Sequence, residues 1–352
     1  MSVSRPRVVI LSSSQCRKQY VTDPDLQRLA QFADPEWIEC TDNPPAGDQE
    51  APDGALIGRI GAAQAIVTGA GTPKLTAEVM DRLPSLRFIG DMDGDRFAGR
   101  VDVEAAWERN IRVVDTTNGT SYPVSEWALA MIIICLRNAG MHFRNMIAGI
   151  TTRSYEERGY LDGDLFGKTV GLIGCGHIGR RLIKFLKPFE APVYVYDPYL
   201  PREMADALGF TLTSLENVLT KTDVIVCLAP ITPRTHGLIG AREIELIPPG
   251  KVFVNVSRGQ IVDSGALIAR LKRGDLVAGL DVFDPEPVPS DSEVLGLPNV
   301  FLSPHLAGVT APSYPRMFSL MVDELERFFQ GHEPYFELTP RSIANRRGTN
   351  LQ

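Results

Sequence analysis

The chain has 352 residues with 36 basic and 43 acidic side chains, a formal net charge of −7 and 44% hydrophobic residues. This composition is typical of a soluble globular protein, and the length favours two domains over a single core. The modest negative charge argues against nucleic acid as the main partner and provides no basic face for an anionic membrane.

The five cysteines are odd in number and lack the spacing of a zinc site. A disulfide framework would need an even set in a short secreted chain, so we expect reduced thiols, no metal and a cytoplasmic protein. The cysteines are Cys16, Cys40, Cys135, Cys175 and Cys227.

The first third of the chain alternates between strand and helix patterns. Helices are expected to open at Asp23-Pro24 and at Asp102, because an acidic side chain can cap a first turn. The alternation predicts a parallel sheet with its own core, and hence a first domain. The expected strands are Arg7–Leu11, Trp37–Cys40, Ala65–Thr68, Leu86–Ile89 and Ile111–Val114.

Residues Val124–Ala148 predict one long helix that is apolar on nearly all sides, which implies burial on several faces. Its most apolar stretch, Trp127–Leu136, is ten residues long and too short to cross a bilayer. We therefore expect a helix that lies in a core or at a subunit contact.

A dinucleotide-binding motif follows the apolar strand Val170–Ile173 and opens a helical pattern. Its first glycine permits a tight turn, the second lets the backbone approach a pyrophosphate, and the third allows close helix packing. The side chains of Cys175 and His177 are expected to be incidental. The expected pyrophosphate contacts are Gly174, Gly176, His177, Ile178 and Gly179.

Asp197 ends the next strand, Pro192–Tyr196. A carboxylate at this point can accept hydrogen bonds from the adenosine ribose and would repel a 2′-phosphate. The motif therefore predicts NAD, not NADP.

Four more strands and a helix over Ser264–Arg273 are expected after Asp197, which predicts a doubly wound sheet of about six strands. A last amphipathic helix covers Ala311–Phe329, and the polar tail Pro340–Gln352 has the composition of a disordered segment. The four strands are Val224–Leu228, Val252–Val256, Val277–Asp281 and Val300–Ser303.

Three of these strands are followed by side chains that suit hydride-transfer chemistry: Arg258, Glu286 and His305. Histidine can carry the proton of a reacting hydroxyl, a carboxylate can orient it, and arginine can hold a carboxylate or carbonyl oxygen. Each of the three could instead have a structural role: Arg258 in a surface ion pair, Glu286 in a solvated loop and His305 as the cap of a turn. Asp281 could face the nicotinamide or simply cap the next turn.

The chain resembles the D-isomer-specific 2-hydroxyacid dehydrogenases, most densely over residues 167–308. The motifs that carry the resemblance are the glycine loop, Tyr196-Asp197-Pro198-Tyr199, Ala229-Pro230-Ile231-Thr232-Pro233, Asn255-Val256-Ser257-Arg258-Gly259, Asp281-Val282-Phe283 with Glu286-Pro287, and Pro304-His305.

The resemblance implies an α/β fold with a flavodoxin-like substrate domain, residues 1–118 and 312–352, and an inserted Rossmann domain, residues 119–311. It implies the catalytic roles of Arg258, Glu286 and His305, and a homodimer built around Val124–Ala148. The further cofactor contacts that we expect are Leu228, Ala229, Pro230, Thr235, Val256, Ser257, Asp281 and Gly308.

The expected substrate loop, which in the family binds a carboxylate through backbone N–H groups, departs from the family pattern. Here it reads Asp91-Met92-Asp93-Gly94-Asp95, and acidic side chains facing an anion would weaken binding. Either the acids point outward, or the substrate is less anionic or carries a cation, or only backbone amides count. Val67-Thr68-Gly69 lacks the arginine of the family's phosphoglycerate enzymes, which disfavours a phosphorylated substrate.

These features predict an NAD(H)-dependent oxidoreductase for a small 2-hydroxy or 2-keto acid. Two alternatives remain open: oxidation of another small anion such as phosphite or formate, and an NAD-sensing protein-binding module of the corepressor type.

Overall fold

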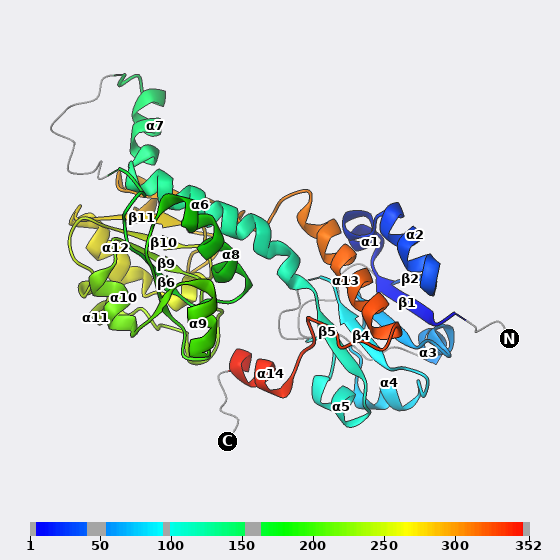
Figure 1. Ribbon diagram of the computed structural model, residues 1–352. Coiled ribbons are helices and arrows are strands. Elements are labelled where there is room, and N and C mark those ends of the chain that lie inside the picture. Colours follow the sequence, from blue (N-terminus) through cyan, green and yellow to red (C-terminus); the bar gives the residue numbers. More distant parts are fainter. Residues whose placement is uncertain (1–4, 41–53, 94–98, 152–162, 348–352) are drawn as a thin grey trace. The chain divides into compact units, whose positions relative to one another are not determined.

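The computed structural model describes residues 5–40, 54–93, 99–151 and 163–347 (Figure 1). By its internal contacts the chain divides into two compact units. Unit 1 combines the chain up to Thr120 with Thr310–Ala344, and unit 2 is Ser121–Val309.

Unit 1 is built on a parallel sheet of order β2-β1-β3-β4-β5, the flavodoxin-like order expected for the substrate domain. The edge strand β2 begins at Asp34, not at the predicted Trp37. It tolerates Pro35, which donates no backbone N–H, because an edge strand has neighbours on one side only. The strands are β1 (Arg7–Ser12), β2 (Asp34–Glu39), β3 (Ala65–Thr68), β4 (Phe88–Asp91) and β5 (Arg112–Asp115).

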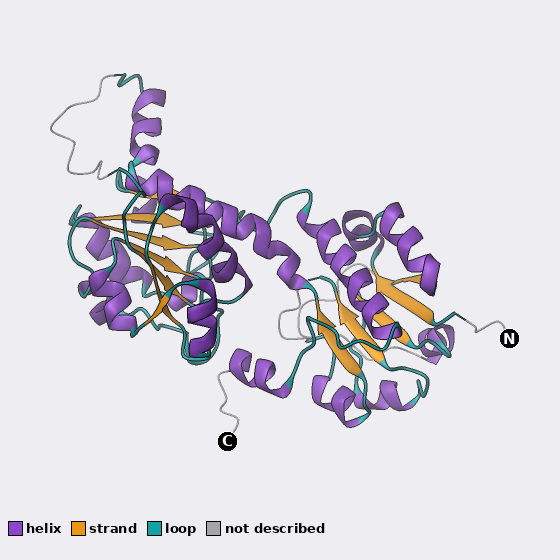
Figure 2. Cartoon of the chain, viewed as in Figure 1, coloured by secondary structure: helices purple, strands orange, loops and turns teal. Residues whose placement is uncertain are grey.

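Helices cover both faces of this sheet, as Figure 2 shows. In β1, Val8 and Ile10 pack with α1, α2 and α13, whereas Val9 and Leu11 pack with α3, α4 and α5, because successive side chains of a strand alternate. The helices are α1 (Ser14–Tyr20), α2 (Asp23–Phe32), α3 (Gly54–Ile60), α4 (Ala77–Asp81), α5 (Val103–Glu108), α13 (Ser313–Phe329) and α14 (Pro340–Arg347).

The starts of α2 and α5 and the C-terminal helix α14 can be compared with the prediction from sequence. Asp102 caps α5 as predicted, but Thr22, not Asp23, caps α2. The prediction of a disordered tail is wrong for α14, since Ile343 and Ala344 are buried and Ile343 joins the core of unit 1. Two apolar side chains at adjacent positions are enough to anchor one short helix.

Unit 2 is built on a parallel sheet of order β12-β11-β10-β9-β6-β7-β8, the Rossmann order. Strand order reverses between β6 and β9, where ligands bind outside the carboxyl ends. The sequence analysis missed β8, which is too short to show a pattern. The strands are β6 (Val170–Ile173), β7 (Val193–Tyr196), β8 (Thr211–Leu212), β9 (Val224–Cys227), β10 (Lys251–Asn255), β11 (Leu276–Leu280) and β12 (Val300–Leu302).

The predicted long helix over Val124–Ala148 is two helices, α6 and α7. The break falls at Asn138, whose φ of +42° is left-handed, a conformation that asparagine tolerates better than most residues. The helices of unit 2 are α6 (Ser121–Leu136), α7 (Ala139–Ile147), α8 (His177–Leu186), α9 (Arg202–Leu208), α10 (Leu215–Lys221), α11 (Ala241–Glu245) and α12 (Ser264–Lys272).

Helix α6 extends a short 3-10 turn, and together they form a helical stretch over Thr117–Leu136. Among the described residues this is the one helix long and apolar enough, by length and composition, to cross a membrane. Just over half of its most apolar window, 56%, is buried, and α6 packs on α8, β10 and β11. Its contacts are those of a core helix, as the sequence predicted.

Asp223, just before β9, ties together the amino ends of three strands of unit 2. It accepts hydrogen bonds from Thr169 N at 2.9 Å and from Lys251 Nζ at 2.8 Å. Burial raises the pKa of this carboxyl, but the hydrogen bonds from Lys251 and Thr169 outweigh it and lower the pKa to about 2.

Asp223→Asn is therefore expected to destabilise the protein by about 1 kcal/mol near neutral pH, a value discounted for solvent screening. Because the folded-state pKa is depressed, this stabilisation is present above the unfolded pKa and is lost as pH falls from about 4 to about 2. Urea unfolding of both proteins at pH 7 and pH 3 measures the difference. If the difference in the free energy of unfolding between the two proteins were equal or larger at pH 3, Asp223 would not be the source of this stabilisation.

Candidate active site

The glycine loop joins β6 to α8 as the sequence predicted. Gly174 has a φ of +90°, and a Cβ there would lie 2.7 Å from backbone atoms of Ala229, so only glycine fits. At Gly176 a Cβ would meet nothing within 4 Å, which leaves room for a ligand against the backbone. Within the described part of the chain, no side chain forms a capping hydrogen bond at the start of α8. This arrangement fits a pyrophosphate at a helix start.

Asp197 lies beside that loop at the end of β7. Its Oδ2 accepts from Cys175 N at 2.9 Å and its Oδ1 from Tyr199 N at 3.0 Å. A carboxylate oxygen has two lone pairs, so each can accept a further hydrogen bond from a ribose hydroxyl. The Cys175 side chain is buried, where burial raises the thiol pKa to about 12, and His177 is exposed.

The remaining predicted cofactor contacts follow β9, β10 and β12 of the same sheet. The hydroxyl of Ser257, after β10, donates to the carbonyl of Ala229, after β9. Thr235 Oγ1 donates to Pro230 O at 2.6 Å and closes the turn between them. The predicted residues that follow strands of this sheet are Leu228, Ala229, Pro230, Thr235, Val256, Ser257 and Gly308.

His305 and Glu286 are in direct contact, with His305 Nδ1 2.5 Å from Glu286 Oε1. They follow the neighbouring parallel strands β12 and β11, which brings their loops to one edge of the sheet. Because a carboxylate accepts, Nδ1 carries the proton of this bond and Nε2 is left to face a substrate. The His305 side chain is 40% exposed, so a small molecule can reach it.

Arg258 follows β10 and is the third member of the catalytic set, which consists of Arg258, Glu286 and His305. Burial lowers the pKa of its guanidinium, although the negative charge of Glu286 acts in the opposite direction. An arginine stays charged through such a shift. Its Nη1 donates to Ser257 O at 2.6 Å, and Asn255 Nδ2 donates to Arg258 O at 3.1 Å, which fixes the turn.

For Asp281 the structure favours the turn cap over the predicted cofactor contact. The residue is wholly buried. Its Oδ1 accepts from Leu306 N and its Oδ2 from Ala307 N, both at 3.0 Å, and its carbonyl accepts from His305 N at 2.8 Å. A carboxylate enclosed in this way holds the turn that carries His305.

In unit 1, two amides of the expected substrate loop are already bonded. Met92 N donates to Thr68 O at 3.1 Å, and Asp93 N donates to Asp91 Oδ1 at 2.9 Å. The expectation that Met92 and Asp93 offer their N–H groups to a substrate is therefore corrected. Gly94 lies outside the described residues.

Two acids of this loop, Asp91 and Asp93, do not point outward. Arg100, which the sequence analysis overlooked, lies 3.3 Å from Asp91 and 2.8 Å from Asp93, and the Tyr20 hydroxyl donates to Asp93 at 2.7 Å. Asp91 is 1% exposed. Burial and the nearby Asp93 raise the Tyr20 pKa, so this hydroxyl keeps its proton. The signal in the sequence that could have predicted this pairing was Arg100, a basic residue a few positions after the acids.

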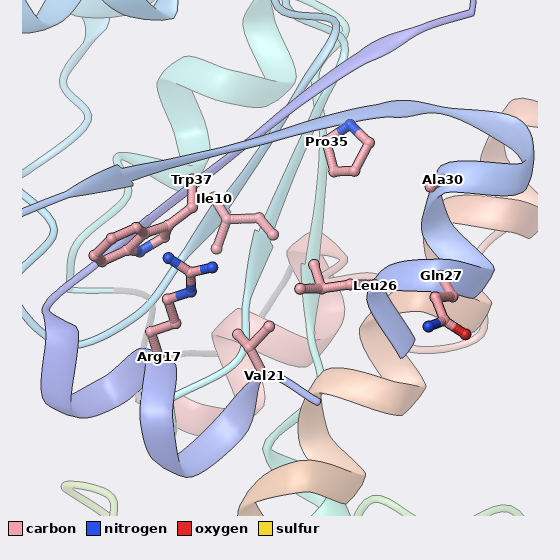
Figure 3. Close-up of a pocket in the computed structure, with 8 residues that line it drawn as sticks. All are labelled: Ile10, Arg17, Val21, Leu26, Gln27, Ala30, Pro35 and Trp37. Carbon is pink, nitrogen blue, oxygen red and sulfur yellow. The ribbon is translucent and has the colours of Figure 1, made fainter. Parts of the chain in front are cut away.

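A cavity of about 280 Å³ lies in unit 1 between β1, β2, α1 and α2 (Figure 3). Its lining is mostly apolar, with the Arg17 guanidinium 4.3 Å from the centre of the Trp37 ring. None of the eight residues that line it is a predicted site residue.

A Rossmann sheet whose strand ends carry a dinucleotide loop, an arginine and a histidine–carboxylate pair defines the class of nicotinamide-dependent dehydrogenases. Within that class, the chain belongs to the D-isomer-specific 2-hydroxyacid dehydrogenases. Residues 129–307 match the model of that family's NAD-binding domain. NAD is the cofactor of this unit, in agreement with Asp197.

Comparison with known proteins agrees with this membership. The chain is 31% identical over 297 residues to a glyoxylate reductase of Thermococcus gammatolerans, covering 82% of this chain and 86% of that protein. It is 32% identical over 278 residues to a D-3-phosphoglycerate dehydrogenase of Methanocaldococcus jannaschii, covering 78% of this chain and 52% of that protein. The chain spans about half the length of such phosphoglycerate dehydrogenases.

Solved structures show the same fold. A phosphoglycerate oxidoreductase from Rhizobium etli matches with a TM-score of 0.82 and 26% identity, covering 95% of this chain and 99% of that one. The apo form of Rhodotorula graminis D-mandelate dehydrogenase matches with a TM-score of 0.79 and 25% identity, covering 95% and 98%.

Asp197→Asn is expected to reduce the preference for NADH over NADPH by about tenfold, because it removes the charge that repels a 2′-phosphate and keeps an oxygen for the glycine loop. Asp197→Ala is expected to weaken both cofactors, since Cys175 N then loses its acceptor. Fluorescence titration with each cofactor measures this. An unchanged preference in Asp197→Asn would show that the carboxylate does not face the ribose.

Proposed function

We propose that this chain is an NAD(H)-dependent dehydrogenase that transfers a hydride between nicotinamide and the C2 carbon of a small 2-hydroxy or 2-keto acid, with specificity for the D isomer. The observation that carries the proposal is the 2.5 Å contact between His305 and Glu286 beside Arg258. Bound NAD(H) supplies or accepts the hydride.

His305 moves the proton. During reduction its Nε2–H donates to the carbonyl oxygen of the keto acid, and during oxidation neutral Nε2 takes the hydroxyl proton. Glu286 holds Nδ1, so the ring keeps one orientation.

Arg258 binds the substrate. Its guanidinium can hold the carboxylate or the carbonyl oxygen of a 2-keto acid with two parallel N–H groups. Its partial burial strengthens this attraction, because water screens the charge less there than at the surface.

The structure favours a substrate without a phosphate. A phosphate would be bound by a cation at the end of β3. The residue at this position is Thr68, which is neutral and fully buried and donates to Gly90 O at 3.1 Å. Arg100 is already bound to two carboxylates. We therefore propose an unphosphorylated keto acid such as glyoxylate or the keto acid of mandelate, two substrate types that relatives' names suggest.

The test is a panel of keto acids with NADH and NADPH, followed by nicotinamide absorbance. Glyoxylate, phenylglyoxylate, a cationic keto acid and phosphohydroxypyruvate separate the substrate classes, and phosphite and formate with NAD test the alternatives. Turnover of an unphosphorylated keto acid with NADH is expected. Turnover of none of these compounds, with tight NADH binding and capture of a peptide partner, would favour the corepressor-type module.

We also propose a cytoplasmic homodimer that uses helix α7. Three large apolar side chains on one face of α7 are exposed, Ile147 at 76% and Phe143 at 68% among them. Spacings of three and four residues from Phe143 place them in one stripe, and such a stripe is typical of a protein contact. The three are Phe143, Met146 and Ile147, and Ile150, just after the end of the helix, is exposed as well.

Phe143→Asp with Ile147→Asp is expected to convert the dimer to monomer, because two charges would be buried in an apolar contact. Sedimentation equilibrium measures the mass. The matched control places two aspartates at exposed polar positions of helix α9 in the same unit, Arg202 and Glu203, and should remain dimeric. A dimeric α7 variant would contradict the proposed contact.

A further inference from the structure

The loop that carries His305 is tied to helix α6 by a chain of hydrogen bonds. Trp127 Nε1, on α6, lies 3.1 Å from Ser303 Oγ, and Ser303 Oγ lies 2.5 Å from Asp281 Oδ1. Asp281 in turn accepts the backbone N–H groups of the two residues after His305. All of these groups belong to unit 2.

Donor and acceptor chemistry sets the direction of this chain. An indole N–H can only donate and a carboxylate can only accept, so the Ser303 hydroxyl accepts from Trp127 and donates to Asp281. Ser303 is 5% exposed and Asp281 is wholly buried. A buried polar group that loses its partner is destabilised, so the three side chains constrain one another.

His305 needs such support because its backbone is in an unusual conformation. Its φ of +53° lies in the left-handed region, which residues other than glycine rarely adopt. The His305 N–H donates to Asp281 O at 2.8 Å. Asp281 therefore holds the loop through both its backbone and its carboxylate.

We propose that Trp127 and Ser303 are positioning residues for the dehydrogenase reaction. They orient the Asp281 carboxylate, which sets the turn that places the His305 imidazole against Glu286. The Trp127 ring also packs against Phe301, with centroids 6.2 Å apart, so only its N–H reaches the chain of bonds. This inference rests on the proposed function.

The chain offers a matched control. Trp37 Nε1 donates to Ser12 Oγ at the same distance, 3.1 Å, but both residues belong to unit 1, whereas Trp127, Ser303 and Asp281 belong to unit 2. Trp127→Phe and Trp37→Phe each remove one indole-to-serine hydrogen bond and keep an aromatic ring. Only the first breaks the link to Asp281.

Trp127→Phe is expected to lower kcat about tenfold and to leave the NADH dissociation constant within about twofold, since small misplacement of a reacting group slows chemistry more than binding. The primary isotope effect on kcat with 4-deuterated NADH should rise. Ser303→Ala should lower kcat further than Trp127→Phe does. Ser303→Thr keeps the hydroxyl and should retain most of the wild-type kcat. Trp37→Phe should match the wild type.

Hydrogen exchange of the cofactor-free protein gives a second readout. The amides of Leu306 and Ala307 should exchange faster in Trp127→Phe and Ser303→Ala than in Trp37→Phe. Equal exchange and equal kcat in the two tryptophan variants would overturn the inference. A wild type that reduces no keto acid would refute the proposed function, whereas the exchange data would still decide whether Trp127 holds this loop.

Discussion

His305→Asn is expected to lower kcat by about 1,000-fold or more while the NADH dissociation constant stays within about twofold. The asparagine amide cannot carry a proton to and from the substrate oxygen. Asparagine is a better test than alanine because it tolerates the left-handed backbone at this position, where φ is +53°. Steady-state kinetics with the best keto acid and fluorescence titration with NADH separate the two effects.

His236→Asn is the control for this prediction. His236 is an exposed histidine of the same unit, in the loop after β9, and is expected to behave as the wild type. A His305 variant with kcat within tenfold of the wild type would show that another group carries the proton. Loss of NADH binding would show that the residue holds the cofactor instead.

Gly259→Ala is expected to lower kcat/KM by at least about 100-fold and to destabilise the fold by about 3 kcal/mol, since overpacking displaces the backbone. A Cβ at Gly259 would lie 1.9 Å from Phe283 O and 2.6 Å from Asp284 N. These atoms belong to the segment that leads to Glu286. The added methyl must therefore separate Arg258 from Glu286.

Gly265→Ala serves as the matched control. Gly265 lies in α12, and a Cβ there would meet its nearest atom, Asp263 Oδ1, at an ordinary 3.5 Å. Alanine favours a helix over glycine, so unchanged activity and equal or greater stability are expected. Thermal unfolding and keto-acid reduction measure both variants. Full activity in Gly259→Ala would mean that the contact between the two loops is not needed.

Several parts of this site followed from local sequence alone. Gly174, Gly176 and Asp197 form a motif whose geometry depends on one strand, one turn and one helix. Arg258, Glu286 and His305 were predictable as neighbours because parallel strands share a carboxyl edge, so residues that end successive strands lie close together. The structure places His305 against Glu286 as that rule requires.

Other parts depended on contacts between distant segments. The helix break at Asn138, the two-residue strand β8 and the helix α14 depend on how the chain packs. The apolar pattern continues across Asn138, and β8 and α14 have too few apolar residues to show a period. The pairing of Arg100 with Asp91 and Asp93 excludes, for these two acids, one of the alternatives that the sequence left open, namely that they point outward. One guanidinium offsets one of the two negative charges, so this cluster repels an anion less than two free carboxylates would.

By itself the sequence determined the fold class, the two units, the choice of NAD and the three side chains proposed for catalysis, because each follows from short motifs and from rules of parallel sheets. Only the tertiary structure decided that Asp281 caps a turn and that Trp127 reaches Ser303, 176 positions along the chain. A hydrogen bond between distant residues depends on distance and direction in space, and no spacing along the sequence encodes either.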